Sequence, residues 1–182
     1  MILIYLSSGL FLGWSLGAND ASNIFGTAVG TRMVRFRTAA IIASVFVILG
    51  AVISGSGAAD TLGELGSVNA LGGAFMVALA AGFSVFWMTR LKLPVSTSQA
   101  IVGAIIGWNL FAGMPTDYNS LSKIVFSWVF SPILAALFSI LIYLLVKKLL
   151  KYIPVSILRR DVYNRTGLIL VGAFGAYSLG AN

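Results

Sequence analysis

The sequence contains no cysteine and no histidine among its 182 residues. The first absence excludes disulfide bonds and thiolate metal sites, and the second removes the commonest general base and metal ligand. Acidic residues are also few, 5 against 12 Lys and Arg, and charged residues make up only 9% of the chain. Because 59% of the residues are hydrophobic, the composition is not that of a soluble domain. The basic excess is therefore interpreted as a determinant of membrane topology, not as a nucleic-acid-binding surface.

Long apolar runs predict an all-α, polytopic membrane protein. Several runs approach the ~20 residues that cross the hydrocarbon core of a bilayer as a helix. The predicted crossings are 38–56, 69–89 and 124–146, with a longer apolar stretch at 1–31 and a shorter one at 101–113. We therefore expect a multi-pass protein of the inner (plasma) membrane.

Positive charge in short connecting segments predicts the orientation. The basic loops 32–37 and 147–165 are predicted to be cytoplasmic. The loop 57–68 carries two acidic residues and no basic one, so it is predicted to lie outside. This assignment alternates along the chain and places the N-terminus outside.

The stretch 69–113 begins and ends outside under this assignment. It forms either two full crossings or a re-entrant hairpin with PVSTS at its tip. Both arrangements return the chain to the outside, so the positions of the flanking loops do not distinguish them. Arg90 and Lys92 precede that tip. They act either as topology anchors or as groups that attract an anion.

Two segments of the chain repeat each other. GLFLGWSLGAN (9–19) and GAFGAYSLGAN (172–182) are identical at seven of eleven positions. The charge argument makes the two copies cross in opposite directions, which is typical of inverted-repeat secondary transporters with broken or re-entrant helices. We expect 1–165 to be a first inverted repeat and 166–182 to be the start of a second, truncated one. The second half, on the same or a separate chain, is an expected partner, and homo-oligomerisation is left open.

Polar residues interrupt the first apolar stretch in GANDASN (17–23). A carboxylate at membrane depth costs about 2.5–3.5 kcal/mol, so Asp20 should face a cavity or a partner. The surrounding residues are expected to loosen the helix. Unwound carbonyls, together with the oxygens of Asn19, Asp20 and Asn23, suit a hard cation such as Na⁺. The alternative is that the helix ends near Gly17 and that Asp20 is an interfacial cap.

The segment PVSTSQ (94–99) predicts the start of a helix that runs to about Ala112. Pro94 suits a helix start, and Ser96, Thr97 and Ser98 then occupy the cap and the first turn. Free N–H groups and the positive end of the helix dipole bind anions. The alternative is ordinary Ser/Thr capping at the membrane surface.

GANDASNIFGTAVG (17–30) and PVSTSQAIVGAIIG (94–107) resemble the two parts of the signature of the inorganic phosphate transporter (PiT) family. The resemblance implies a secondary active transporter that imports inorganic phosphate with Na⁺ by alternating access, with no bound cofactor and no enzymatic activity. Members often have Thr-His where this chain has Ser98-Gln99. The missing His favours Na⁺ over a proton as the coupled ion. A sulfate or other oxyanion symporter and an H⁺-coupled phosphate permease are the alternatives.

The resemblance also implies roles for individual residues. The phosphate-binding set is Asn23, Thr27, Ser96, Thr97, Ser98 and Gln99. The sodium-binding set is Asn19, Asp20, Asn23 and Ser96. An enzymatic alternative, an intramembrane aspartyl hydrolase, would need a second carboxylate at membrane depth. The other acidic residues all lie in predicted loops, which argues against this alternative.

Overall fold

The computed structural model describes residues 2–66, 68, 71–152 and 156–182. These residues form seven helices and no strand beyond a single isolated bridge between Gly66 and Thr116. The helices are α1 (Ile2–Gly30), α2 (Phe36–Ser54), α3 (Ser56–Leu65), α4 (Leu71–Arg90), α5 (Thr97–Ala112), α6 (Tyr118–Tyr152) and α7 (Ile157–Ala181).

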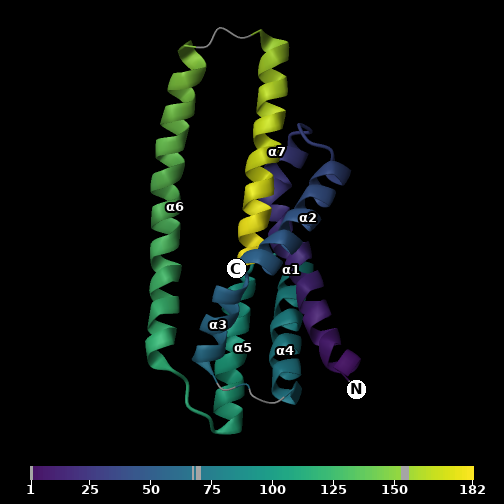
Figure 1. The fold of residues 1–182 in the computed structure, drawn as a ribbon, viewed down its shortest axis with the longest axis vertical. Helices are drawn as coiled ribbons and strands as arrows, with labels where there is room; N and C mark the ends of the chain where they lie inside the picture. Colours follow the sequence, from purple (N-terminus) through teal and green to yellow (C-terminus); the bar gives the residue numbers. More distant parts are fainter. Residues whose placement is uncertain (1, 67, 69–70, 153–155) are drawn as a thin grey trace.

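The helices run up and down one long axis (Figure 1). α1 rises from the N-terminus. α2 and α3 then descend as one path that is broken at Gly55, which ends α2 and precedes α3. α4 and α5 form a hairpin that rises to the middle of the molecule and returns to the same end. α6 rises along nearly the whole length, and α7 descends from the top to the middle, where the chain ends.

Two apolar clusters hold this arrangement, one above the middle of the molecule and one below it. In the upper cluster, Phe25 of α1 packs with Ala39 and Ala43 of α2 and with Ala176 of α7. The lower cluster gathers side chains from α3 to α6, and its buried members are Leu65, Val77, Val102 and Ile105. Between the two clusters along α1, Asn19 and Asp20 contact the hairpin formed by α4 and α5.

At Gly50 and Gly180, the backbones of α2 and α7 approach each other more closely than a side chain at these positions would allow. A Cβ placed on Gly180 would lie within 1.9 Å of the Val47 carbonyl oxygen. A Cβ on Gly50 would lie 2.0 Å from the Tyr177 carbonyl oxygen. Small residues at such crossings let backbones touch, which is how membrane helices gain packing energy without a hydrophobic driving force.

Among the described residues, three helices, α2, α4 and α6, are long and apolar enough to cross a membrane. No residue in the most apolar window of α6 is buried inside the protein, so lipid or another protein must cover this helix. The predicted class, an all-α helical membrane protein, is confirmed.

The structure corrects three local predictions. The stretch 17–23 does not unwind, since α1 is helical from Ile2 to Gly30. The predicted outer loop 57–68 is largely the helix α3, because Leu62 and Leu65 give it an apolar face that packs on the lower cluster. The predicted basic loop 147–165 is mostly the end of α6 and the start of α7, and its residues 153–155 lie outside the described part.

Candidate functional site at the tip of the α4–α5 hairpin

The candidate site forms where the tip of the α4–α5 hairpin meets the middle of α1. The hydroxyl of Thr97, at the first residue of α5, donates to Oδ2 of Asp20 at 2.7 Å. Thr97 is buried at 3% exposure, and Asp20 is half-buried. The hydrogen bond gives Asp20 a partner from another helix, so Asp20 is not an isolated cap at a helix end.

Asn19 holds the other flank of the tip. Its amide lies 2.8 Å from the Thr89 hydroxyl at the end of α4. Oriented with Nδ2 toward the hairpin, the amide accepts from Thr89 and donates to the Val95 carbonyl (3.0 Å) and to Oδ1 of Asp20 (3.2 Å). In this orientation both the oxygen and the nitrogen of the Asn19 amide have hydrogen-bond partners. Asn19 and Asp20 are therefore paired through tertiary contacts, which removes the need for the helix to unwind at these two residues.

The start of α5 is built as the sequence predicts. Ser96 is the N-cap in an extended conformation, and its hydroxyl accepts from the Gln99 N–H at 3.3 Å. One residue into the helix, the Ser98 hydroxyl accepts from Nδ2 of Asn182 at 2.9 Å. The N-terminus of α5 thus lies next to Asp20 of α1 and Asn182 at the end of α7.

A pocket of about 490 Å³ lies between these elements. Its lining comprises Asp20, Asn23, Pro94, Val95, Ser96, Thr97, Ser98, Leu179 and Asn182. Asn19 is buried behind this lining at 7% exposure, whereas Thr27 and Gln99 are exposed and lie outside it. The structure thus brings together most of the residues that the sequence singles out.

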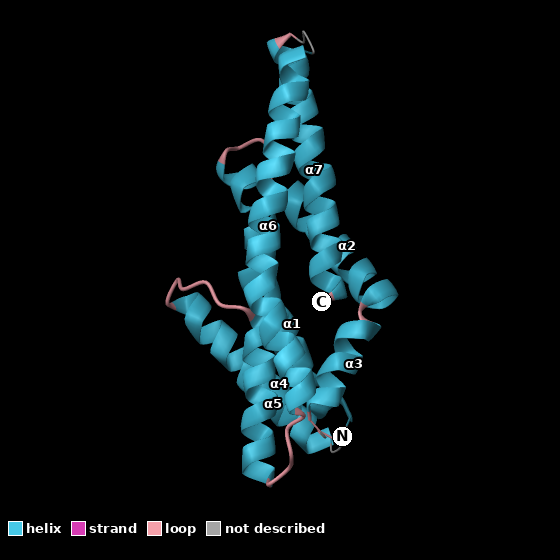
Figure 2. Ribbon diagram, turned by 90° about the vertical axis from the view of Figure 1, so that its left-hand side faces the viewer, coloured by secondary structure: helices cyan, strands magenta, loops and turns pink. Residues whose placement is uncertain are grey.

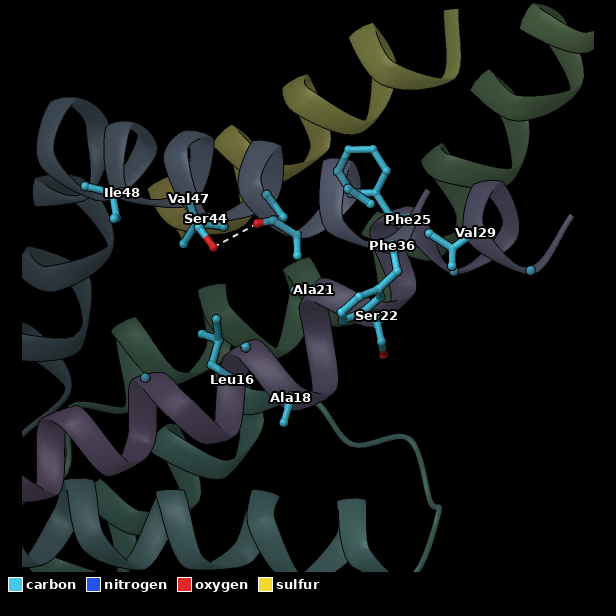
Figure 3. A pocket seen from close by; sticks show the side chains of 17 residues that line it. Leu16, Ala18, Ala21, Ser22, Phe25, Val29, Phe36, Ser44, Val47 and Ile48 are labelled. Atoms are coloured by element: carbon cyan, nitrogen blue, oxygen red, sulfur yellow. Dashed lines mark hydrogen bonds between the residues drawn. The ribbon is translucent and has the colours of Figure 1, made fainter. Parts of the chain in front are cut away.

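A larger cavity, of about 810 Å³, lies between α1 and α2. Figure 3 shows its lining, in which Leu16 of α1 and Val47 of α2 turn apolar groups toward the space. Ser44 also lies there, but its hydroxyl donates to the Ala40 carbonyl of its own helix. Because this groove presents apolar surface without a charged group, it suits a hydrocarbon chain or a helix. The smaller polar pocket is the candidate for ions.

Sequence reasoning missed three contributors to the site. These are the Thr89 hydroxyl, the Val95 carbonyl and the Asn182 amide. The repeat held a signal for Asn182, since it ends the second SLGAN as Asn19 ends the first. The two asparagines contact opposite flanks of the same hairpin tip, and the helices that carry them run in opposite directions (Figure 1).

The arrangement combines two kinds of ion chemistry. One carboxylate with hydroxyl, amide and carbonyl oxygens around it suits a hard cation, and a capped helix N-terminus with free N–H groups suits an oxyanion. In the part of the chain that the structure describes, no group of three or more His, Cys, Asp or Glu residues gathers.

Comparison with known proteins agrees with this chemistry. The profile of the phosphate transporter family matches residues 16–182. The chain belongs to that family. The family and its members are transporters and permeases, not enzymes. No solved structure matches the chain.

Two relatives illustrate the range of the family. The chain is 34% identical over 184 residues to sodium-dependent phosphate transporter 1 of Mus musculus, covering 91% of this chain and 25% of the relative. It is 33% identical over 160 residues to a protein of Pyrococcus furiosus with the provisional name phosphate permease, covering 79% of this chain and 37% of the relative. The chain thus spans about a quarter to two fifths of the length of these relatives.

Proposed function

We propose that the chain is one half of a secondary transporter that imports inorganic phosphate with Na⁺ by alternating access. The observation that carries the proposal is the hydrogen bond between Asp20, in the middle of α1, and Thr97, at the start of α5. It brings a carboxylate suited to a cation against a helix N-terminus suited to an anion. Cotransport of two ions of opposite sign needs such a combined site.

In this proposal, Asn23, Ser96, Thr97 and Ser98 contact phosphate, with Asn182 as an added member. The sodium set is Asn19, Asp20, Asn23 and Ser96. Thr27 and Gln99 stay predictions, because they lie outside the pocket lining.

Electrostatics explains why a cation should accompany the anion. A membrane potential that is negative inside opposes anion entry by about 2.3 kcal/mol per charge per 100 mV. Phosphate carries between one and two negative charges near neutral pH. Two or more Na⁺ ions remove this penalty and add the energy of the sodium gradient. Asp20 helps to balance charge in the loaded site.

We further infer that the N-terminus lies outside and that the α4–α5 hairpin is re-entrant. Both ends of the hairpin lie at the same end of the molecule as Ile2, and its tip lies in the middle (Figure 1). The basic ends of α6 and α7 lie at the opposite end, which the positive-inside rule assigns to the cytoplasm. The opposite directions of α1 and α7 support an inverted repeat, whose second half supplies a matching set of ligands.

The proposal is tested by binding of labelled phosphate to the purified chain in Na⁺ and in choline. We expect Na⁺-dependent binding that falls at least tenfold in Asp20→Asn and is unchanged in Asp60→Asn, whose exposed carboxylate lies on α3. Excess sulfate should compete poorly. Binding that ignores Na⁺ or survives Asp20→Asn would refute the proposed site, and binding that prefers sulfate would refute the substrate. Reconstituted alone, the chain should not catalyse uptake, so uptake by the chain alone would refute the need for a second half.

A further inference from the structure

Two cations lie at the tip of the α4–α5 hairpin, next to the candidate site. Arg90 ends α4, and Lys92 follows two residues later; both side chains are exposed. The Arg90 guanidinium lies 5.9 Å from the ring centroid of Phe86. Within the described ranges, the ion pair of the protein is Asp161–Arg165, so no carboxylate neutralises either cation.

The depth of this tip in the membrane can be estimated from its position along α1. The contact between Thr89 and Asn19 places the end of α4 level with Asn19. At 1.5 Å per residue, Asn19 is about 26 Å from the start of α1 and about 16 Å from its end at Gly30. By composition α1 is not among the three helices apolar enough to cross, but its whole length of about 43 Å equals that of a bilayer of ~30 Å hydrocarbon with its headgroup regions. The cations therefore lie roughly 10 Å inside the hydrocarbon boundary on the cytoplasmic side.

Other helices confirm that apolar surface surrounds this level. α2 lies above the tip and exposes Ile41, Ile48 and Val52. α6 passes the tip near its middle in both views (Figures 1 and 2), within the uncharged run 124–146. The tip is thus neither above nor below the hydrocarbon layer.

Unpaired cations at this depth are expensive. Each costs about 2.5–3.5 kcal/mol on insertion scales, so the two together approach the total stability of many domains. The fold also accepts a further cost at Lys92, which closes α4 with φ +61°, a left-handed position that glycine or asparagine usually fills. The backbone bonds of Lys92 and Leu93 to the carbonyls of Thr89 and Met88 fix this conformation. Water at the tip would remove most of the cost of placing the two unpaired cations at this depth.

We propose that a water-filled vestibule reaches from the cytoplasmic side to the hairpin tip, and that Arg90 and Lys92 form its cationic floor. Pro94 and Val95 connect these cations to the lining of the polar pocket, so an oxyanion passing between the pocket and the cytoplasm passes the two positive charges. Their field raises the local concentration of an oxyanion at this mouth. The inference rests on the proposed orientation and substrate.

The absence of native cysteine makes single-cysteine probes clean. Leu93→Cys places a thiol at the tip, where the side chain is 48% exposed. Val129→Cys, at a 58% exposed position within the apolar run of α6, is the matched control. A membrane-impermeant methanethiosulfonate reagent is applied to inside-out and right-side-out vesicles. We expect Leu93→Cys to react at the cytoplasmic face only and Val129→Cys to react at neither. An unreactive tip, or one labelled from outside, would overturn the proposal.

The charge of the floor is tested by comparing an anionic reagent with a cationic one at Leu93→Cys. Adding Arg90→Gln or Lys92→Gln should lower the ratio of anionic to cationic rates severalfold, whereas Lys123→Gln, near the start of α6, should leave it unchanged. An unchanged ratio in all three would overturn the role of the cations. A labelled tip without Na⁺-dependent phosphate binding would refute the proposed function and support the vestibule. Na⁺-dependent phosphate binding with an unlabelled tip would support the proposed function and refute the vestibule.

Discussion

The close crossing of α2 and α7 predicts that Gly50→Ala destabilises the protein. The new Cβ would lie 2.0 Å from the Tyr177 carbonyl oxygen and 3.0 Å from the Ala181 nitrogen. Both neighbours are backbone atoms, so the helices must separate by at least the 1.0 Å that divides 2.0 Å from the 3.0 Å below which real Cβ contacts essentially do not occur. Overpacking of this kind costs about 1–3 kcal/mol, and rigid neighbours favour the upper end. Alanine regains up to about 1 kcal/mol of helix propensity, which leaves a net loss of about 1–2 kcal/mol.

The matched control is Gly167→Ala on α7, where a Cβ meets nothing within 4 Å. It gains the propensity term without the clash, so it should be neutral or stabilising by up to about 1 kcal/mol. Both variants are measured by unfolding in mixed detergent micelles, followed by circular dichroism. Equal stability of Gly50→Ala and Gly167→Ala would show that α2 and α7 do not touch at their backbones, and the reasoning would fail.

Two further predictions concern caps and hydroxyls. Asp117 precedes α6, and the hydroxyl of Ser120 donates to its carboxylate at 2.8 Å, which is the main reason its pKa lies below the usual value. Because the folded pKa is lower than the unfolded one, this stabilisation is present above the unfolded pKa and is lost as the pH falls through the folded pKa. Asp117→Ala should therefore lower the melting temperature at pH 7, and this difference from the parent chain should shrink as the pH falls through the folded pKa. A pH-independent difference would contradict this. The Tyr177 hydroxyl pairs with that of Ser54 at 2.5 Å, so Tyr177→Phe should cost about 0.6 kcal/mol in the same unfolding assay, with Tyr143→Phe on exposed α6 as the neutral control.

The helix starting near PVSTSQ was predictable because its signals are local. Pro94 favours a helix start, Ser96 caps it, and the helix ends at Ala112 followed by Gly113 in the left-handed conformation. These signals act within one turn of the chain, so the sequence alone contains them. The proximity of the site residues was predictable through the family resemblance, since the spacing between Asp20 and Thr97 carries no distance information by itself.

The continuity of α1 was not predictable from local sequence. Glycine and asparagine weaken an isolated helix, and the prediction that the stretch 17–23 loosens followed from that. In the folded chain, Thr89 and Thr97 of the hairpin pair with Asn19 and Asp20, so tertiary contacts replace what unwinding would have provided. The helix α3 was missed for a related reason, because its apolar side chains pack against residues of α5 and α6 that are distant in the sequence.

Gly55 has a mechanical consequence. It is the single residue between α2, which is locked to α7 in the upper cluster, and α3, which belongs to the lower cluster. The polar pocket lies between these two bodies. A hinge at Gly55 and the glycine-containing middle of α1 would let one body tilt against the other while both apolar cores stay intact. Under the proposed function, ions bound between the bodies would set the angle of that hinge, and the residues that hold them would also be the residues that move.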